Sequence, residues 1–557
     1  MSSSDRRKPD DHTGSASQQA AKTEHCLGRW PVHVVLLPLF FMLSFYVTNI
    51  LEFSFSDMAV PTAKAIGAAL VLWGILALAM RNIRKGAAVV AVATVLFFMR
   101  KHIINLIPDF ELPILGMVVN RFALVITLLA GACIVFALFV AKSKRSWSVP
   151  TSLINALAIC VTAVAGFQAV SLNLSSGNVD VSLSAADSSA VTAVQGGQAL
   201  PNIYHIVADA YARNDVLKEW FGYDNQPFLD WLAEKGFFVA DKARVNYAHT
   251  HLSLSSTLNM SYFSFPQNRS NEANMSALRH LFYSNRVCEK LHNLGYKIIC
   301  YPSGYSMTAK INNATYPHDE WMDEFERSVF MQGGEQEFNA HRRRILYALD
   351  HIGDPCETEG PVFVFSHMLC PHPPFVFTET GEPRKVKAPY QHSGGSHWYL
   401  TGEGTVEDYR QQYLGQLKFM NSKLRGTIEA ILANSSRPAI IIFQGDHGPN
   451  SMLDWDSVYN TNMHEKLTTT IAYYFPDQQY DLLYDEITPV NSYRVIFNQY
   501  FGESNRMLEE RSYFSASRTP FYFVDVTERA ESLEGTERSP NPSIGLGPPS
   551  GRHALTR

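Results

Sequence analysis

The chain has 557 residues, too many for one ordinary domain, so we expect two or three structural units. Its composition is 46% hydrophobic and 18% charged, and its formal net charge is −5. A weakly acidic chain without any RNA- or DNA-binding motif offers no basic surface for nucleic acid, which argues against nucleic acid as a partner.

Five apolar stretches precede residue 170, and each approaches the roughly 20 residues that cross a bilayer as a helix. The first is too long and too deep in the chain to be a cleaved signal peptide. Five such runs in series exceed what soluble domains carry, so we predict a five-helix transmembrane anchor over 30–170, after a cytoplasmic tail over 1–29. The stretches are 31–51, 60–80, 86–107, 119–141 and 149–170.

The basic residues predict how the anchor is oriented. The N-terminal tail and the loops around Arg84 and Lys144 are basic, whereas Glu52 to Met58 contains no Lys or Arg. Basic loops stay in the cytoplasm. We therefore expect an integral protein of the cell (inner) membrane with a cytoplasmic N-terminus and, after an odd number of spans, a periplasmic or extracellular soluble half.

The third stretch is interrupted near its outer end by Arg100, Lys101 and His102. Long basic side chains at this depth can snorkel to the interface, or they can contact an anionic lipid headgroup. If this stretch did not cross the membrane, the number of spans would be even and the soluble half would lie in the cytoplasm.

Composition also divides the rest of the chain. Residues 171–199 are rich in Ser, Ala, Gly and Val, which predicts a flexible linker. Residues 528–557 are charged and then rich in Pro, Gly and Ser, which predicts a disordered tail. The domain between them, 200–527, holds four cysteines that either form disulfides or remain buried thiols; they are Cys288, Cys300, Cys356 and Cys370.

Strand-like and helix-like segments alternate within this domain. Such alternation predicts an α/β fold with a mostly parallel sheet flanked by helices. The expected strands are 202–208, 296–301, 362–366 and 439–443, and the expected helices are 225–235, 286–293 and 407–432.

Polar residues follow two of these strands. Asp209 follows the first, and Asp446-His447-Gly448 follows the last after a short interval. Open α/β sheets build their sites at the carboxyl edge of the strands. Asp and His together suit a divalent metal such as zinc or manganese.

Thr250 lies between these motifs, in a segment that leads into a helix for which Ser253 is a candidate N-cap. A hydroxyl near a helix N-terminus sits in a positive field that favours an incoming anion. When such an oxygen is bound to a cation, its pKa falls and it can act as a nucleophile.

The order of the motifs resembles that of the alkaline phosphatase/sulfatase superfamily. The chain matches it at Pro201 to Asp209, the Thr250 loop, Pro371-His372-Pro373 and Asp446-His447-Gly448. With the predicted anchor, it looks like the membrane-bound branch that contains lipoteichoic acid synthases and phosphoethanolamine transferases. The resemblance covers roughly residues 200–500 and, more loosely, the anchor.

The resemblance implies a role for each matched residue. One divalent ion, zinc or manganese rather than calcium, would be bound by Asp209, Thr250, Asp446 and His447, with Thr250 also the nucleophile. His372 would contact the substrate phosphate or the leaving group, and His367 is a second candidate for that role. If the alignment shifts, the nucleophile would instead be one of the later hydroxyls, Ser253, Ser255 or Thr257.

Three departures from the sulfatase pattern favour phosphoryl chemistry over sulfate esters. Asp209 is followed by Ala210 and not by a second aspartate. Thr250 replaces the cysteine that sulfatases oxidise to formylglycine. The later motif is Asp-His and not Asp-Asn, and an imidazole favours a softer ion than calcium.

We therefore predict a membrane-anchored enzyme that transfers or hydrolyses a phosphoryl-linked group on a lipid-linked or cell-envelope substrate. Two alternatives stay open. One is a sulfuric or phosphoric ester hydrolase for which the anchor is only a tether. The other is a non-catalytic membrane scaffold that keeps the fold. The donor, the acceptor and the oligomeric state are not defined by the sequence.

Overall fold

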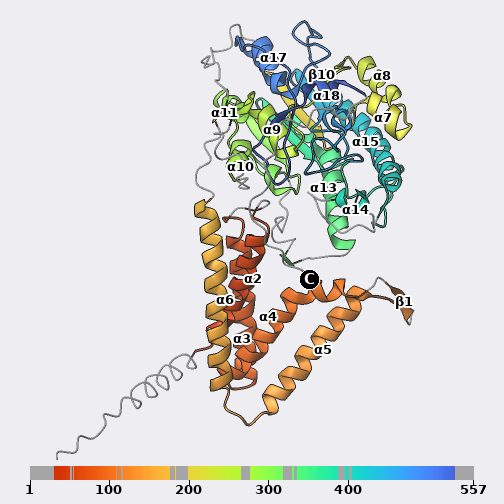
Figure 1. The fold of residues 1–557 in the computed structure, drawn as a ribbon. Helices are drawn as coiled ribbons and strands as arrows, with labels where there is room; N and C mark the ends of the chain where they lie inside the picture. Colours follow the sequence, from red (N-terminus) through yellow and green to blue (C-terminus); the bar gives the residue numbers. More distant parts are fainter. Residues whose placement is uncertain are drawn as a thin grey trace, which may run out of the picture.

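A bundle of apolar helices stands beneath an α/β domain in the computed structural model of the chain (Figure 1). The predicted tail over 1–29 lies outside the described residues. The structure describes residues 30–50, 53, 55–107, 110–114, 117–175, 182–183, 199–264, 276–317, 329–330, 335–386, 395–400 and 404–533.

The helical bundle confirms the predicted anchor. Its helices are α2 (His33–Thr48), α3 (Ala59–Ala79), α4 (Ile83–Asn105), α5 (Arg121–Lys142) and α6 (Ser148–Ser175). Four of them are long and apolar enough to cross a membrane, whereas α2 has only 16 residues and is shorter than the predicted 31–51. Helix α2 nevertheless packs along α6, where Asn155 Oδ1 accepts a hydrogen bond from the His33 amide (3.1 Å).

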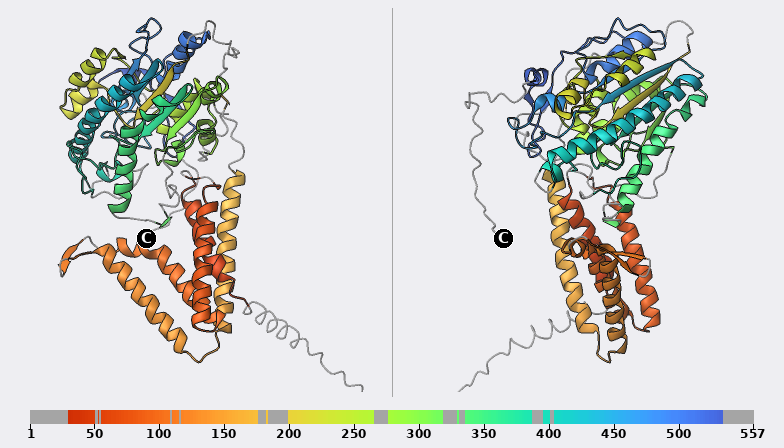
Figure 2. Two further views of the ribbon diagram at one scale, coloured as in Figure 1. Left: turned by 180° about the vertical axis from the view of Figure 1, so that it is seen from behind. Right: turned by 90° about the vertical axis from the view of Figure 1, so that its right-hand side faces the viewer.

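The end of the bundle at which α6 ends lies next to the α/β domain (Figure 2). Asp57, after α2, lies 3.5 Å from Arg279 of that domain. Helices α4 and α5 are joined through the hairpin of β1 (Glu111–Ile114) and β2 (Met117–Asn120). In Figure 1 and in the left view of Figure 2, α5 leans away from α2, α3 and α6.

Order extends further into the predicted linker than expected. Helix α6 continues to Ser175, beyond the predicted end at residue 170. Residues Ser182–Leu183 form strand β3, which pairs with β6 (Phe263–Ser264). Residues 176–181 and 184–198 lie outside the described part.

A six-stranded sheet forms the centre of the α/β domain. Its order is β5 (Phe238–Val239), β10 (Ile471–Tyr474), β9 (Ala439–Gly445), β4 (Asn202–Ala208), β8 (Val362–Met368) and β7 (Lys297–Tyr301). The last four are parallel, which confirms the predicted strands and the mostly parallel sheet. Strands β10 and β5 add an antiparallel edge.

Alternate residues of β4 support two separate cores, because successive side chains of a strand point to opposite faces. Tyr204 and Ile206 pack on one side, against α7 (Asn214–Phe221), α8 (Gln226–Glu234), α13 (Glu335–His351) and α15 (Val406–Asn434). Ile203 and Val207 pack on the other, against α9 (Thr250–Asn259), α11 (Arg286–Asn293) and α17 (Pro489–Phe501). Helices therefore cover both faces of the sheet.

The end of the described chain corrects one prediction. Helix α18 (Thr527–Glu531) lies where we placed the start of a disordered tail at residue 528. Its Ala530 is buried, and the Ala530 carbonyl lies 2.7 Å from His464 Nδ1 of α16 (Met463–Leu467). Glu531 pairs with Arg244 at 2.7 Å. These distant partners hold the helix in place despite its polar composition, and residues 534–557 lie outside the described part.

The thiols of Cys288, Cys300 and Cys370 are free and buried, which is the second of the two predicted states. Nothing is described for the side chain of Cys356. There is therefore no disulfide among these three residues.

Gly445, the last residue of β9, is enclosed so tightly that a side chain cannot fit. A Cβ atom there would lie 2.0 Å from Thr469 Oγ1 and 2.7 Å from the Tyr211 carbonyl oxygen. We expect Gly445→Ala to lower the free energy of unfolding by about 1–3 kcal/mol, because overpacking forces the backbone to move. Thermal denaturation of the detergent-solubilised protein measures this change.

The control is Gly426→Ala in the exposed part of α15, where a Cβ atom would meet nothing within 4 Å. Alanine in a helix interior is favoured over glycine by up to about 1 kcal/mol, so this variant should be at least as stable as the parent. Equal stability of the two variants would contradict the close approach at Gly445.

Candidate metal centre and active site

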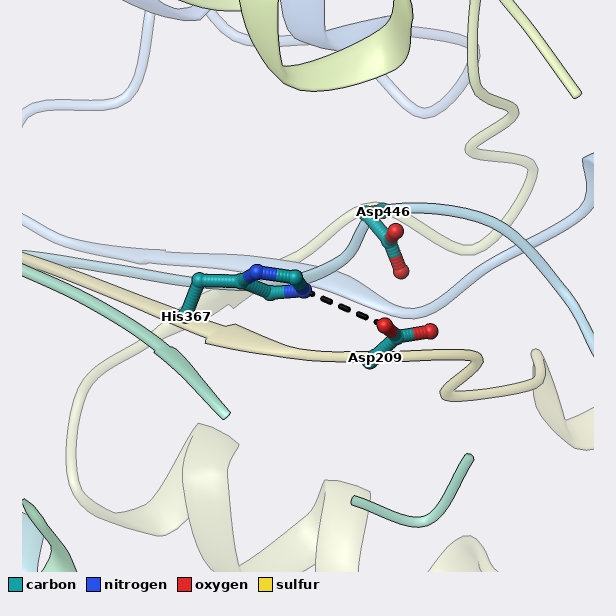
Figure 3. A group of neighbouring side chains, drawn as sticks. All are labelled: Asp209, His367 and Asp446. Carbon is teal, nitrogen blue, oxygen red and sulfur yellow. Dashed lines mark hydrogen bonds and ion pairs between the residues drawn. The ribbon is translucent and has the colours of Figure 1, made fainter. Parts of the chain in front are cut away.

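Strand register brings the two predicted aspartates to the same edge of the sheet. Ala208 of β4 pairs with Gly445 of β9, so Asp209 and Asp446 each follow the last paired residue of adjacent parallel strands. Met368 of β8 pairs with Ala208 from the other side, and its carbonyl accepts a hydrogen bond from the Asp209 amide (2.9 Å). Figure 3 shows Asp209 and Asp446 facing each other, with His367 beside them.

Each of the two carboxylates has one oxygen that is satisfied and one that is not. Asp446 Oδ1 accepts hydrogen bonds from the amides of Ala210 and His447, both at 3.0 Å. Asp209 Oδ2 lies 3.2 Å from His367 Nε2. Asp209 Oδ1 and Asp446 Oδ2 are buried without a hydrogen-bond partner. Unsatisfied carboxylate oxygens inside a protein are costly, so this pair calls for a cation.

His447 completes the arrangement with Thr250. The Nδ1 atom of His447 lies 2.8 Å from the Gly448 carbonyl, which can only accept, so Nδ1 carries the proton and Nε2 has the free lone pair. That Nε2 atom is 3.2 Å from Thr250 Oγ1 and 3.6 Å from both Asp209 Oδ1 and Asp446 Oδ2. A neutral imidazole oriented by a backbone carbonyl is a common metal ligand.

Thr250 is the first residue of α9 and is only half buried. The prediction that Ser253 caps this helix is wrong, because the N-cap is His249 and Ser253 lies one turn inside. The other candidate nucleophiles, Ser253, Ser255 and Thr257, are buried within α9. The Thr250 hydroxyl, in contrast, contacts the carboxylate cluster through His447.

His367 lies inside the cluster and not at its rim. Its Nε2 atom faces Asp209, and its Nδ1 atom lies 2.9 Å from Thr308 Oγ1. The Asp209 carboxylate can only accept and a hydroxyl can donate, so both partners are satisfied when Nε2–H donates to Asp209 and Thr308 donates to Nδ1. The ligand atoms of Asp209, His367 and Asp446 all lie within 4.8 Å of one another, which makes His367 a possible metal ligand as well.

His372 lies next to the cluster on the loop after β8. Its ring centroid is 6.1 Å from that of His447, and its amide donates to the Asp209 carbonyl (3.1 Å). Its Nδ1 atom hydrogen-bonds the Pro373 carbonyl, so a neutral ring keeps its lone pair on Nε2. All six predicted site residues are therefore brought together by the fold.

The electrostatics of the two aspartates differ. Burial and the charge of Asp209 raise the pKa of Asp446 to about 7. For Asp209, burial acts in the same direction, but His372, His367 and His447 outweigh it and hold its pKa below the ordinary value. Burial lowers the pKa of His447 and of His372, which favours the neutral ring over the protonated ring whose charge would lower the pKa of Asp209.

The donor set fits one divalent cation. Two carboxylate oxygens, an imidazole nitrogen with a free lone pair and a threonine oxygen converge from three elements. Imidazole together with carboxylate suits zinc or manganese, whereas calcium prefers an all-oxygen shell. The two unsatisfied oxygens are the observation that carries this fit.

The residues directly after Asp209 do not join the cluster. Tyr211 is buried in the core and donates to Asn421. Arg213 pairs with Asp215 at 2.7 Å, and Asp215 in turn faces His464 at 2.7 Å. His249 and His251, on either side of Thr250, stack on each other with ring centroids 5.6 Å apart.

Comparison with known proteins gives one family match by sequence. The family described as Sulfatase matches residues 201–491, just over half of the chain and the region that contains every residue of the cluster. No curated protein matches the sequence significantly. The chain belongs to the sulfatase family.

Several solved structures are similar to the chain. Lipooligosaccharide phosphoethanolamine transferase A of Neisseria meningitidis is 11% identical, with 84% of this chain and 95% of that chain covered and a TM-score of 0.38. The periplasmic domain of EptC of Escherichia coli is 12% identical, with coverages of 60% and 96% and a TM-score of 0.38. A sulfatase of Bacteroides thetaiotaomicron is 14% identical, with coverages of 58% and 83% and a TM-score of 0.34.

Lys466 is a further buried charged group of this sulfatase-family domain, and no sequence motif pointed to it. It is fully buried in α16, donates to Asn450 Oδ1 (2.7 Å) and lies 5.5 Å above the Trp455 ring. Burial lowers its pKa to about 8, while Asp446 and Asp209 act in the opposite direction. No local pattern around residue 466 signals this position, because it depends on contacts with distant loops.

The raised pKa of Asp446 predicts a pH dependence of stability in the metal-free protein. A group whose pKa is raised on folding stabilises the protein below its unfolded-state pKa, and this contribution is lost as the pH rises through the folded-state value. The free energy of unfolding of the wild type, relative to Asp446→Asn, should therefore fall between about pH 5 and about pH 7. Chemical denaturation of chelator-treated protein at several pH values measures this difference, in which the contributions of the buried histidines largely cancel.

Zinc should reverse the trend, because a metal ligand must be deprotonated. The rise in melting temperature on adding zinc should be larger at pH 8 than at pH 5, and much smaller in Asp446→Asn. A zinc effect of the same size in both proteins would contradict a cation site at Asp446.

Proposed function

We propose that the protein is a metal-dependent phosphotransferase that acts on lipid-linked substrates at the outer face of the membrane through a covalent intermediate on Thr250. The family match supports an enzyme of the sulfatase type. The observation that carries the proposal is the convergence of Thr250 Oγ1, His447 Nε2 and two unsatisfied aspartate oxygens at one sheet edge.

One divalent cation would be held by Asp209, Asp446, His447 and Thr250. Bound there, it would lower the pKa of the Thr250 hydroxyl and neutralise charge on the phosphoryl oxygens. The tautomer of His447 supports its role as ligand, because Gly448 holds the ring with Nε2 free. We propose that His367 holds Asp209 in position, since Nε2–H can donate to Asp209 Oδ2 while Thr308 donates to Nδ1.

Thr250 would act as the nucleophile. Its hydroxyl is only half buried at the N-terminus of α9, where the helix dipole and the free backbone N–H groups favour an anion. Its oxygen would form a bond to phosphorus while the bond from phosphorus to the donor oxygen breaks. A hydroxyl of a second substrate, or water, would then release the group from Thr250. The ammonium group of Lys466 adds positive charge close to Asp446 and Asp209, where the anionic group would bind.

His372 would carry the proton from the attacking hydroxyl to the departing oxygen: its free Nε2 would take up the proton that Thr250 loses and then give it to the oxygen that leaves phosphorus. Its Nδ1 atom is engaged by the Pro373 carbonyl, which leaves Nε2 to exchange protons with a substrate. Its position beside His447, with ring centroids 6.1 Å apart, supports a role at the leaving group.

The anchor supports a donor that resides in the bilayer. An odd number of predicted spans and the basic loops favour a cytoplasmic N-terminus and a catalytic domain outside the cytoplasmic membrane. The contact of Asp57 with Arg279 agrees with this, because it places the loop after α2 on the same side as the catalytic domain. We propose that residues 200–533 form the catalytic unit, longer than the predicted 200–527 by the helix at 527–531 and the residues just after it.

Thr250→Ala should abolish turnover, because the residual rate without a nucleophile is at least about a thousandfold lower. The assay follows transfer of a labelled headgroup from phospholipid in proteoliposomes, together with hydrolysis of an aryl phosphate. Ser255→Ala is the matched control, because it removes a buried hydroxyl from the same helix. It should keep most of the activity.

The outcomes separate the remaining hypotheses. Release of free phosphate or sulfate without headgroup transfer would favour the hydrolase with a tethering anchor. Equal rates for wild type and Thr250→Ala, or a wild type without bound metal, would favour the non-catalytic scaffold. Loss of activity in Ser255→Ala but not in Thr250→Ala would indicate that the nucleophile is Ser255 and not Thr250.

His372→Gln should affect substrates according to their leaving group. An alkyl phosphate leaves as a strong base and needs a proton, so its kcat should fall by about 10²–10⁴-fold. A p-nitrophenolate needs no proton, so hydrolysis of p-nitrophenyl phosphate should change little. Equal losses on both substrates would argue that His372 binds phosphate and does not donate a proton.

A further inference from the structure

Arg100, near the outer end of α4, bonds to the soluble half of the chain. Its Nη2 atom donates to the carbonyls of Val329 (3.0 Å) and Phe330 (2.7 Å), more than two hundred residues away. Its Nη1 atom donates to the Phe97 carbonyl of its own helix. The side chain is 5% exposed, so neither water nor lipid surrounds it.

The two residues that Arg100 holds are seated in an apolar socket on the anchor. The Phe97 ring lies 4.0 Å from the guanidinium carbon, and its centroid is 6.3 Å from that of Phe330. Val329 is 1% exposed. It is packed in one cluster with residues of α2, α6 and the loop after α2, which are Met42, Leu43, Tyr46, Phe53, Met58, Ala165 and Ala169.

For Arg100, these contacts replace both explanations that the sequence allowed for the basic triplet. Lys101 and His102 are exposed, as snorkelling or headgroup-binding residues should be, whereas Arg100 is turned into the protein. A planar guanidinium can donate to several carbonyls at once, while its flat face stacks on an aromatic ring. This geometry is better suited to joining two parts of a protein than to binding a lipid phosphate.

A second contact lies close to the first. Asp57, in the loop after α2, is 3.5 Å from Arg279 of α10 (Ser276–Tyr283). Helix α10 packs on α9, where Asn259 Nδ2 donates to the Leu281 carbonyl (3.0 Å). The helix that begins with Thr250 is thus linked to the loop after α2 through α10, by the contact of Asp57 with Arg279 and that of Leu281 with Asn259.

We propose that Arg100 is a positioning residue that locks Val329 and Phe330 into the socket and so holds the catalytic domain in one orientation over the bilayer. The socket supplies apolar burial and Arg100 supplies the directional bonds. Without them, the domain would remain folded but would no longer present its site to substrates in the membrane. The effect on substrates rests on the proposed function, whereas the docking itself does not.

Docking is tested without any enzymatic assay. In the full-length protein in nanodiscs, Val329→Cys places a thiol in the socket without altering the carbonyl that Arg100 binds. We expect slow reaction with a water-soluble maleimide, and at least about tenfold faster reaction when Arg100→Gln is added, because a charged hydrogen-bond donor is lost. Site-resolved mass spectrometry distinguishes this thiol from the native cysteines. An unchanged rate would overturn the proposal.

Two controls make the result specific. Lys101→Gln removes the same charge from the next residue, which is exposed, and should leave the thiol protected. An effect of Lys101→Gln equal to that of Arg100→Gln would point to lipid headgroups and overturn the proposal. The buried thiols of Cys288, Cys300 and Cys370 report folding, and they should stay unreactive in Arg100→Gln if only the docking is lost. Their exposure together with the introduced thiol would mean general unfolding and would also count against it.

Turnover then tests the consequence. Arg100→Gln should lower kcat/KM for labelled phosphatidylethanolamine in the nanodisc by about tenfold or more, while hydrolysis of soluble p-nitrophenyl phosphate stays the same. Equal losses on both substrates would overturn a positioning role. A wild type without activity on either substrate would contradict the proposed function, and the maleimide rates would still decide the docking.

Discussion

Two buried carboxylates at the ends of adjacent parallel strands impose the main physical constraint on the soluble half. Asp209 and Asp446 are 1% and 0% exposed, and neighbouring like charges repel strongly where water is excluded. The fold surrounds them with compensating groups from separate elements: His367 of β8, His447 after β9, Lys466 of α16 and backbone N–H groups. One oxygen on each carboxylate still lacks a partner, and a divalent cation would remove that deficit.

This constraint also explains the placement of the hydroxyl. Thr250 comes from a helix on one face of the sheet, whereas the carboxylates come from the sheet edge, so the hydroxyl meets the cluster from outside and stays partly exposed. The three other hydroxyls considered as nucleophiles are buried at later positions of the same helix. Among these hydroxyls, Thr250 is therefore the one at the boundary between the buried cluster and the outside, which is the position that the proposed function requires.

A similar balance governs the junction with the membrane. Burial of the Arg100 guanidinium would be costly alone, and carbonyls of a distant segment together with an aromatic ring offset that cost. The junction combines apolar burial with directed hydrogen bonds, so it can fix the orientation of the α/β domain on the anchor as well as its attachment. The helical anchor and the α/β domain of this sulfatase-family chain are thus connected by side-chain contacts and not only by the peptide linker after α6.

Local sequence determined the strands that end at the site, the helices around them, the apolar helices of the anchor and the Asp209, Thr250 and Asp446-His447 positions. It could do so because buried strands and membrane helices are continuous apolar runs, and because the polar residues of an α/β site directly follow such runs. Only the tertiary structure revealed His367 beside Asp209, Lys466 in the cluster, the antiparallel edge of β10 and β5, the helix at 527–531 and the partners of Arg100. Each of these depends on residues far away in the chain. Contacts between distant residues produce no periodic pattern in the local sequence, so the sequence did not predict them.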